Sequence, residues 1–170
     1  MLFQKKEIST LSFNPFKEIG SDWYLLTAGT LENYNTMTAS WGFMGFMWGT
    51  PSFSCGVRTN RHTFSFMEEN EYFTASFFDE SYRSALQFCG TRSGRDYDKA
   101  KETGLTPIQL DEGVSFEEAK KVIVCRKQFA SMMDESSFTS PETYQKWYSK
   151  DPCHKQYIGE IVAIYEKTVF

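Results

Sequence analysis

The chain has 170 residues, of which 41% are hydrophobic and 24% charged, a balance typical of one globular domain with a core of its own. Its formal net charge of −4 excludes general nucleic-acid binding, which needs an extended basic face to neutralise phosphates. The four cysteines form no CxxC pair, so the sequence predicts neither a zinc site nor a thioredoxin-like motif, and we expect free thiols in a reducing compartment.

The first ten residues, MLFQKKEIST, lack the apolar run of a signal peptide. The uncharged stretch 33–57 contains a GxxxG spacing, but its polar side chains, four glycines and one proline are incompatible with a membrane helix. We therefore expect a cytoplasmic protein that does not bind membranes.

The first half of the chain is rich in strand patterns. Residues 22–31 combine aromatic, aliphatic and Thr side chains, which predicts a strand leading into a turn at 32–35. Further strands are predicted at 36–45 and 52–58, separated by the residues GTP at 49–51. Residues 71–78 form another, and Asp79 is a good N-cap for a helix over 80–90.

The second half mixes helices and strands. A helix is predicted over 94–104, with Gly104 as its C-terminal stop. The apolar patterns at 119–130 and 157–167 indicate strands, and residues 140–149 begin as a capped helix. Because strands outnumber helices and do not alternate regularly with them, we predict a mainly β fold. An antiparallel barrel or sandwich with peripheral helices would form a single domain over residues 1–170.

Two short basic motifs are candidates for anion binding. VRTNRHT places Arg58, Arg61 and Thr63 directly after a predicted strand, and a guanidinium can meet phosphate oxygens two at a time. In TRSGRDYDK, Ser93 and Gly94 lie where a loop is predicted to become a helix. Backbone N–H groups, the Ser93 hydroxyl and the helix N-terminus could point at one phosphate there, with Arg95 and Lys99 nearby.

Each basic motif also has a plainer interpretation. The first pair of arginines could be solvated at the surface. Ser93 could merely cap a helix whose basic residues pair with Asp96 and Asp98. The residues alone leave both readings open, although no Walker loop is present.

A third feature is the stretch NYNTMTASW. Asn35, Thr36, Thr38 and Ser40 intersperse with larger residues and lead to Trp41, which predicts a strand with a polar edge. Such an edge could exchange hydrogen bonds with a heteroaromatic ring. The alternative is a half-buried strand with a solvated face.

Taken together and in order, NTMTASW, WGTP, RTNRHT, SFFDESYRSAL, CGTRSGRDYDK, GLTP and YIGEI resemble the flavin reductase family, including flavoredoxin-like proteins with an FMN-binding split β-barrel. The resemblance runs from about residue 33 to the last strand. It implies a homodimer with one FMN per subunit near the dimer interface. It also implies that the cofactor contacts are Asn35, Thr36, Met37, Thr38, Ala39, Ser40 and Trp41 along the ring and ribityl chain, and Arg58, Arg61, Thr63, Ser93, Gly94, Arg95 and Lys99 around the phosphate.

The function implied by this resemblance is that of an FMN-dependent oxidoreductase. NADH or NADPH would reduce the flavin, and the electrons would pass to a small-molecule acceptor. The alternatives are an FMN-binding electron carrier without nicotinamide turnover of its own, and a module that binds another phosphate ligand. His154 is the candidate for contact with flavin or substrate, a structural histidine being the alternative, and we expect Cys89 to be a packing residue.

Overall fold

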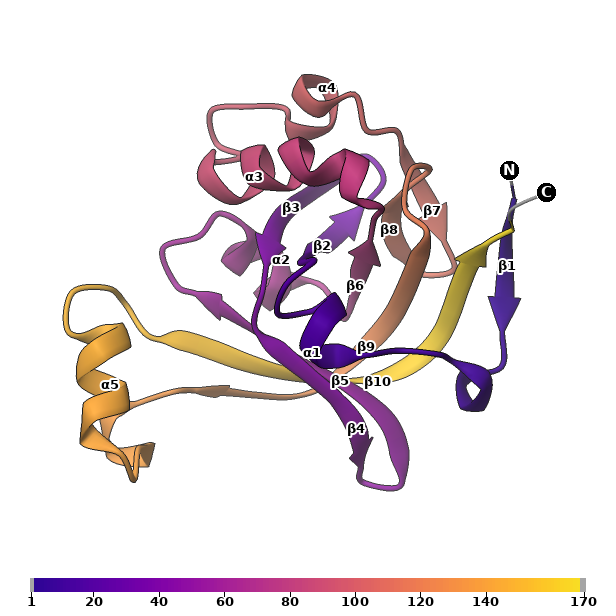
Figure 1. The fold of residues 1–170 in the computed structure, drawn as a ribbon. Helices are drawn as coiled ribbons and strands as arrows, with labels where there is room; N and C mark the ends of the chain where they lie inside the picture. Colours follow the sequence, from indigo (N-terminus) through magenta and orange to yellow (C-terminus); the bar gives the residue numbers. More distant parts are fainter. Residues whose placement is uncertain (1, 169–170) are drawn as a thin grey trace.

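The protein was analysed as a computed structural model that describes residues 2–168. Its main sheet has eight strands in the order β3-β2-β6-β9-β10-β5-β4, with β1 paired to β10, and every pairing is antiparallel. Helices lie around this sheet rather than between its strands (Figure 1). The predicted mainly β, antiparallel architecture with peripheral helices is therefore confirmed.

The element bounds follow the chain. The strands are β1 (Phe3–Lys6), β2 (Tyr24–Thr30), β3 (Asn33–Ala39), β4 (Gly42–Met47), β5 (Thr50–Arg58), β6 (Tyr72–Phe77), β7 (Pro107–Leu110), β8 (Gly113–Phe116), β9 (Lys121–Met132) and β10 (His154–Lys167). The α-helices are α1 (Pro15–Glu18), α2 (Thr63–Glu69), α3 (Arg83–Thr91), α4 (Lys99–Thr103) and α5 (Pro141–Tyr148). Short 3₁₀ turns are η1 (Ile8–Thr10), η2 (Glu80–Tyr82) and η3 (Glu135–Ser137).

Strand β2 separates two hydrophobic clusters. Tyr24 and Leu26 point into the cluster inside the barrel, whereas Leu25 points into the cluster beneath α3, where it joins Leu86 and Phe116. Successive side chains of a strand face opposite sides, so a strand covered on both faces is continuously apolar. This explains why the pattern at residues 22–31 was a reliable strand signal.

The predicted turn at 32–35 and the single strand over 36–45 are wrong in their bounds. The turn is shorter, because Thr30 pairs with Asn33 and the Thr30 hydroxyl accepts a hydrogen bond from the Asn33 N–H at 3.2 Å. The long strand is broken after Ala39. Here the Tyr24 hydroxyl donates to the Trp41 carbonyl at 2.8 Å, and Gly42 adopts a φ of 153°, so the chain changes direction before β4.

The helix predicted over 94–104 is also corrected. Only Lys99–Thr103 is helical, because the Asp98 side chain caps it by accepting from the Lys101 N–H at 3.2 Å. Ser93 instead closes a tight turn, accepting from the Arg95 N–H at 3.2 Å, so Ser93 and Gly94 do not lie at a helix N-terminus. Gly104 has a φ of 71° and does end the helix, as predicted.

The helix predicted over 80–90 consists of η2 followed by α3, and the Asp79 side chain makes no capping hydrogen bond to η2. The strands predicted at 52–58, 71–78, 119–130 and 157–167 correspond to β5, β6, β9 and β10. In α5, Ser140 caps the helix by accepting from the Thr143 N–H, with Pro141 in the first turn, as predicted. Helices α1 and α2 and strands β1, β7 and β8 were not predicted.

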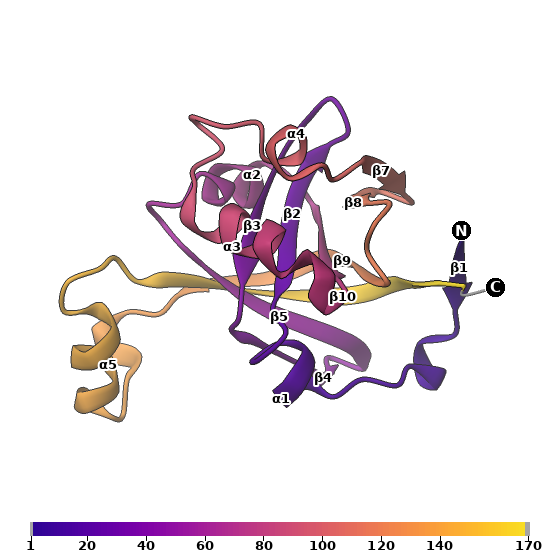
Figure 2. The ribbon, with the colours of Figure 1, turned by 45° about the horizontal axis from the view of Figure 1, so that its top comes forward.

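Strands β9 and β10 continue beyond the barrel and carry α5 at their far end (Figures 1 and 2). Residues 133–153, which link the two strands, are called the arm below. The arm contains an aromatic cluster of its own, in which the rings of Phe138, Tyr144 and Tyr148 are 5.4 to 5.7 Å apart. It is thus a small packed unit joined to the barrel through two strands.

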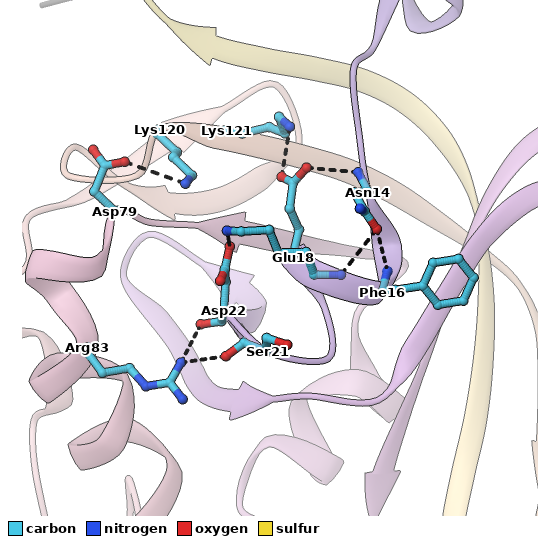
Figure 3. A network of polar contacts seen from close by, with 10 residues as sticks. Asn14, Phe16, Glu18, Ser21, Asp22, Asp79, Arg83, Lys120 and Lys121 are labelled. Carbon is cyan, nitrogen blue, oxygen red and sulfur yellow. Dashed lines mark hydrogen bonds and ion pairs between the residues drawn. The ribbon is translucent and has the colours of Figure 1, made fainter.

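The N-terminal segment is fastened to the barrel by a polar network around α1 (Figure 3). Glu18 accepts from the Lys121 ammonium at 2.9 Å and from the Asn14 N–H at 3.1 Å. Arg83 donates to the carbonyls of Ser21 and Asp22. Among residues 2–168, no helix has the length and hydropathy required to cross a membrane.

Candidate functional site

Two adjoining pockets lie between β3, the end of β5 and the α3–α4 loop. One, here called the basic pocket, has a volume of about 340 Å³. Of the predicted site residues it gathers Asn35, Met37, Arg58, Arg61, Thr63, Ser93, Gly94, Arg95 and Lys99. The other, here called the aromatic pocket, has a volume of about 350 Å³ and is lined by Met37, Thr38, Ala39, Ser40, Trp41, Gly56, Arg58, Arg61, Trp147 and His154.

The two pockets share Met37, Arg58 and Arg61, so they lie next to each other. Every predicted site residue except Thr36 lines at least one of them. Thr36 is buried, and its hydroxyl lies 2.8 Å from the Thr27 hydroxyl inside the sheet. The expected polar edge of this strand is therefore shorter than predicted. The Thr38 hydroxyl also turns away, since it donates to the Leu86 carbonyl on α3.

The α3–α4 loop approaches β3 very closely at Gly94. A Cβ atom there would fall inside contact distance of the Asn35 carboxamide oxygen, so only glycine fits without displacing that side chain. Asn35 is itself buried and donates to the Thr63 hydroxyl at 2.7 Å, which links β3 to the start of α2. These contacts join β3, the start of α2 and the α3–α4 loop at the floor of the basic pocket.

Lys99 is the most enclosed cation of the site, with 7% of its surface exposed. Its ammonium donates to the carbonyls of Thr36 and Cys89, both at 2.8 Å, and so ties β3 to α3. Burial, assisted by the charge of Arg61, lowers the pKa of Lys99 to about 8. Near neutral pH the group is largely charged, and within residues 2–168 no ion pair joins it to a carboxylate.

The pocket arginines are likewise bonded to neutral groups. Arg61 donates to the Gly90 carbonyl at 3.0 Å, and Arg95 donates to the Asn60 carbonyl at 3.5 Å. Within residues 2–168, no ion pair joins a basic residue of this pocket to Asp or Glu, although the carboxylate of Asp151 lies at the rim. The expected alternative, in which Arg95 and Lys99 pair with neighbouring aspartates, is not observed.

Arg58 is directed toward the arm. Its Nη1 donates to the Pro152 carbonyl at 2.7 Å and its Nη2 to the Trp147 carbonyl at 3.2 Å. The guanidinium also lies 5.3 Å from the centre of the Tyr148 ring. Arg58 therefore lines both pockets while it binds residues that are about ninety positions away in the sequence.

The aromatic pocket is walled by rings from three segments. Trp41 makes an edge contact with Trp147 at 4.8 Å between ring centres and lies 4.9 Å from the His154 ring. The Tyr148 hydroxyl and His154 Nδ1 are 2.9 Å apart. Burial, together with the charges of Arg58 and Arg61, lowers the pKa of His154 to about 4, so the imidazole is neutral near pH 7.

The lining residues that the sequence did not predict are Gly56, Asn60, His62, Thr91, Arg92, Trp147 and Asp151. His62 lies within the RTNRHT motif, and its position there was an available signal. Trp147 and Asp151 belong to the arm, and no local pattern placed that segment beside β3.

All four cysteines are free thiols, and burial raises the pKa of Cys89 to about 11. Cys89 is therefore a packing residue, as expected. Over the described part of the chain, no cluster of three or more His, Cys, Asp or Glu side chains is placed to hold a metal ion.

The profile of the family described as "Flavin reductase like domain" matches residues 16–168 of this sequence. The chain belongs to the flavin reductase-like family. Its resemblance to that family, first seen in short motifs, thus extends across nearly the whole sequence. No curated protein matches the chain significantly.

Solved structures show the same flavin reductase-like fold. Flavoredoxin from Methanosarcina acetivorans is 19% identical, with a TM-score of 0.67 over 93% of this chain and 75% of that one. The FMN-binding protein from Thermus thermophilus with bound 1-cyclohex-2-enone is 19% identical, with a TM-score of 0.66 over 94% of this chain and 80% of that one. A Streptomyces globisporus NADH:FAD oxidoreductase in complex with NAD and FAD fragments is 12% identical, with a TM-score of 0.62 over 86% and 74%. The predicted split-barrel fold is thereby confirmed.

Proposed function

We propose that the protein binds FMN across the two pockets and works as an oxidoreductase. The phosphate would lie in the basic pocket and the isoalloxazine ring in the aromatic pocket. The observation that carries this proposal is the cluster of Arg61, Arg95 and Lys99, whose side-chain hydrogen bonds all go to neutral carbonyls beside a pocket walled by rings. Family membership and the names of the solved relatives support the choice of ligand.

The chemistry of the basic pocket fits a phosphate. A phosphate monoester is close to a dianion at neutral pH, and partial burial requires several charge-assisted hydrogen bonds. Arg61, Arg95 and Lys99 supply the positive charge, and the Ser93 hydroxyl and Thr63 lie on the same lining. The close approach of Gly94 to Asn35 would let the loop backbone face the ligand directly.

The aromatic pocket would orient the flavin ring. Residues 37–41 form one side, and Trp41 and Trp147 offer apolar ring surface, which suits a flat heteroaromatic ligand. A neutral His154 contributes a hydrogen bond rather than a charge, and we propose that it contacts the flavin or the substrate. When bound, FMN supplies the hydride and electron chemistry, while the protein positions it and excludes water.

We also propose that the protein forms a homodimer through the β4–β5 hairpin. This hairpin exposes large apolar side chains, with Phe46 70% exposed and Phe43 and Trp48 each 56% exposed. Trp48 packs 5.9 Å from Phe129 of β9, which is itself exposed and extends the surface. Clusters of this kind usually mark an interaction site. Light scattering should show a dimer for the wild type and a monomer for Phe46→Glu.

The proposed donor is NADH or NADPH, the proposed acceptor a small molecule, and the proposed location the cytoplasm, where the four free thiols would stay reduced. A carrier that binds FMN without nicotinamide turnover is the second candidate, favoured by the likeness to a flavoredoxin.

Two measurements separate these functions. Purified protein is titrated with FMN and followed by flavin absorbance and fluorescence. It is then mixed anaerobically with NADH or NADPH. Rapid bleaching of the bound flavin is the expected result for the oxidoreductase. A protein that binds FMN but stays yellow is a carrier, and a protein that binds no FMN contradicts both candidates.

A further inference from the structure

The arm lies against the proposed ring site through few contacts. Figures 1 and 2 show α5 standing away from the barrel at the end of β9 and β10. At the site, Arg58 contacts Trp147, Tyr148 and Pro152 of the arm. Trp41 makes an edge contact with Trp147, and the Tyr148 hydroxyl lies beside His154. Arg58 thus bonds the backbone of Trp147 directly, in addition to the ring contact that Trp147 makes with Trp41.

Arginine is well suited to this role. Its planar fork can donate to two carbonyls at once while its face lies on an aromatic ring, and a lysine ammonium cannot reproduce that geometry. In Arg58, Nη1 and Nη2 serve two different carbonyls of the arm, and the guanidinium faces Tyr148. Arg61 and Arg95, by contrast, each donate to a single carbonyl next to the basic pocket.

We propose that Arg58 is a positioning residue that fastens the arm over the aromatic pocket, and that Trp147, held in this way, contacts the bound ring and restricts the pocket to flat ligands. This inference rests on the proposed binding of FMN. It assigns Arg58 to the ring end of the site and leaves the phosphate to Arg61, Arg95 and Lys99. Loss of Arg58 should therefore weaken any ligand with the ring, with or without a phosphate.

The test compares FMN with riboflavin, which has the same ring and no phosphate. For Arg58→Ala we expect both dissociation constants to rise by the same factor, at least about tenfold. For Arg95→Ala we expect only that of FMN to rise. Arg126→Ala is the matched control, since Arg126 on β9 pairs with Glu160 on β10 outside both pockets, and should change neither constant by more than about threefold. A loss confined to FMN in Arg58→Ala, or no loss at all, overturns the proposal.

A spectroscopic signal reports on Trp147 directly. An indole in contact with a flavin quenches its fluorescence, so bound riboflavin should become brighter in both Trp147→Phe and Arg58→Ala, each made in a Trp41→Phe background that removes the other indole of the aromatic pocket. Trp23→Phe serves as the control, because Trp23 stacks on Arg83 away from these pockets. Unchanged fluorescence in Trp147→Phe would show that Trp147 does not contact the ring and would contradict the proposal.

Hydrogen exchange separates failure of this inference from failure of the proposed function. In the ligand-free protein, Arg58→Ala should speed exchange of the amides of residues 142–148 in α5 and leave those of α3 unchanged. Arg58→Lys should give only partial rescue. Unchanged exchange in the arm overturns the fastening role even if FMN binds, whereas a wild type that binds no flavin contradicts the proposed function itself.

Discussion

Lys121 and Lys99 are almost equally buried, with 8% and 7% of their surfaces exposed, yet their surroundings differ in kind. Lys121 forms an ion pair with Glu18 at 2.9 Å and also donates to the Ser12 carbonyl. Lys99 has only two carbonyls as acceptors, and its pKa is lowered to about 8. The Glu18 carboxylate offsets the cost of burying Lys121. Lys99 has no such ion-pair partner among the described residues.

The same contrast extends over the two regions. Around α1, Lys17 pairs with Asp22. Nearby, Lys120 pairs with Asp79 (Figure 3). Around the basic pocket, the arginines donate only to carbonyls. The first arrangement stabilises the docking of the N-terminal segment. The second leaves the positive charges of the basic pocket without carboxylate partners in a partly buried position. This arrangement is the one expected of a binding site rather than of structural ion pairs.

The largest effect should come from removing the Lys121–Glu18 ion pair beside α1. Lys121→Met leaves Glu18 without its cation in a mostly buried site, and we expect a loss of about 3 kcal/mol in the free energy of unfolding, measured in urea. The neighbouring Lys120→Met is the control, because its pair with Asp79 is exposed and should contribute less than about 1 kcal/mol. FMN affinity should be unchanged in both. Equal losses in the two variants would contradict the contrast.

The next largest effects are expected from replacing the arginines of the basic pocket. Arg61→Ala and Arg95→Ala should each weaken FMN binding by about 1.5 to 3 kcal/mol, the range for hydrogen bonds to charged groups. Calorimetric titration measures this loss. Lys101→Ala, a solvated charge in the adjacent helix, should shift binding by less than about 0.5 kcal/mol. If both arginine variants keep the wild-type affinity, the phosphate is bound elsewhere.

Lys99 predicts a pH dependence for binding. As the pH rises through about 8, the free protein loses the ammonium charge, so FMN affinity should fall, by at most about tenfold per pH unit. The phosphate is already a dianion in this range and does not contribute. Titrations between about pH 7 and 9 should show the decline in the wild type and a flat profile in Lys99→Met. A decline of equal slope in the variant would exclude Lys99 as its source.

His154 predicts an effect on the free energy of unfolding in acid. Its folded pKa of about 4 lies below the ordinary value of 6.5, so the unfolded chain binds a proton first as the pH falls. Stability from this group is present above pH 6.5 and is lost between pH 6.5 and about 4. Urea midpoints for His154→Asn should vary less over that window than those of the wild type. An identical pH dependence would show that His154 remains accessible to protons.

Much of the sheet was predictable because its signals are local. The apolar run at residues 22–31 becomes β2 and Gly104 ends α4, each for a reason contained in a few neighbouring residues. The start of α4 was misplaced because Asp98 competes with Ser93 as the capping residue. Ser93 and Asp98 are both residue types that can cap a helix. The burial of Lys99 against β3 and α3 favours the start at Asp98.

The sequence indicated which residues come together around the two pockets, but not which groups each side chain contacts. The basic motifs and residues 35–41 do converge, with Thr36 turned inward. The burial of Lys99 was not foreseen, because a lysine beside aspartates reads as a solvated charge. The contact between Arg58 and Trp147 spans 89 positions and depends on the length of β9 and β10, which no local pattern specifies.

The arm's own aromatic cluster has a consequence for kinetics. A unit that is packed internally but fastened by few contacts can swing open as a whole without unfolding the barrel. If it covers the ring, the frequency with which the arm opens limits how fast the cofactor leaves, while contacts at both the ring end and the phosphate end contribute to the affinity. We therefore expect the ring end of the site to govern how long the ligand stays, in addition to its contribution to how tightly the ligand is held.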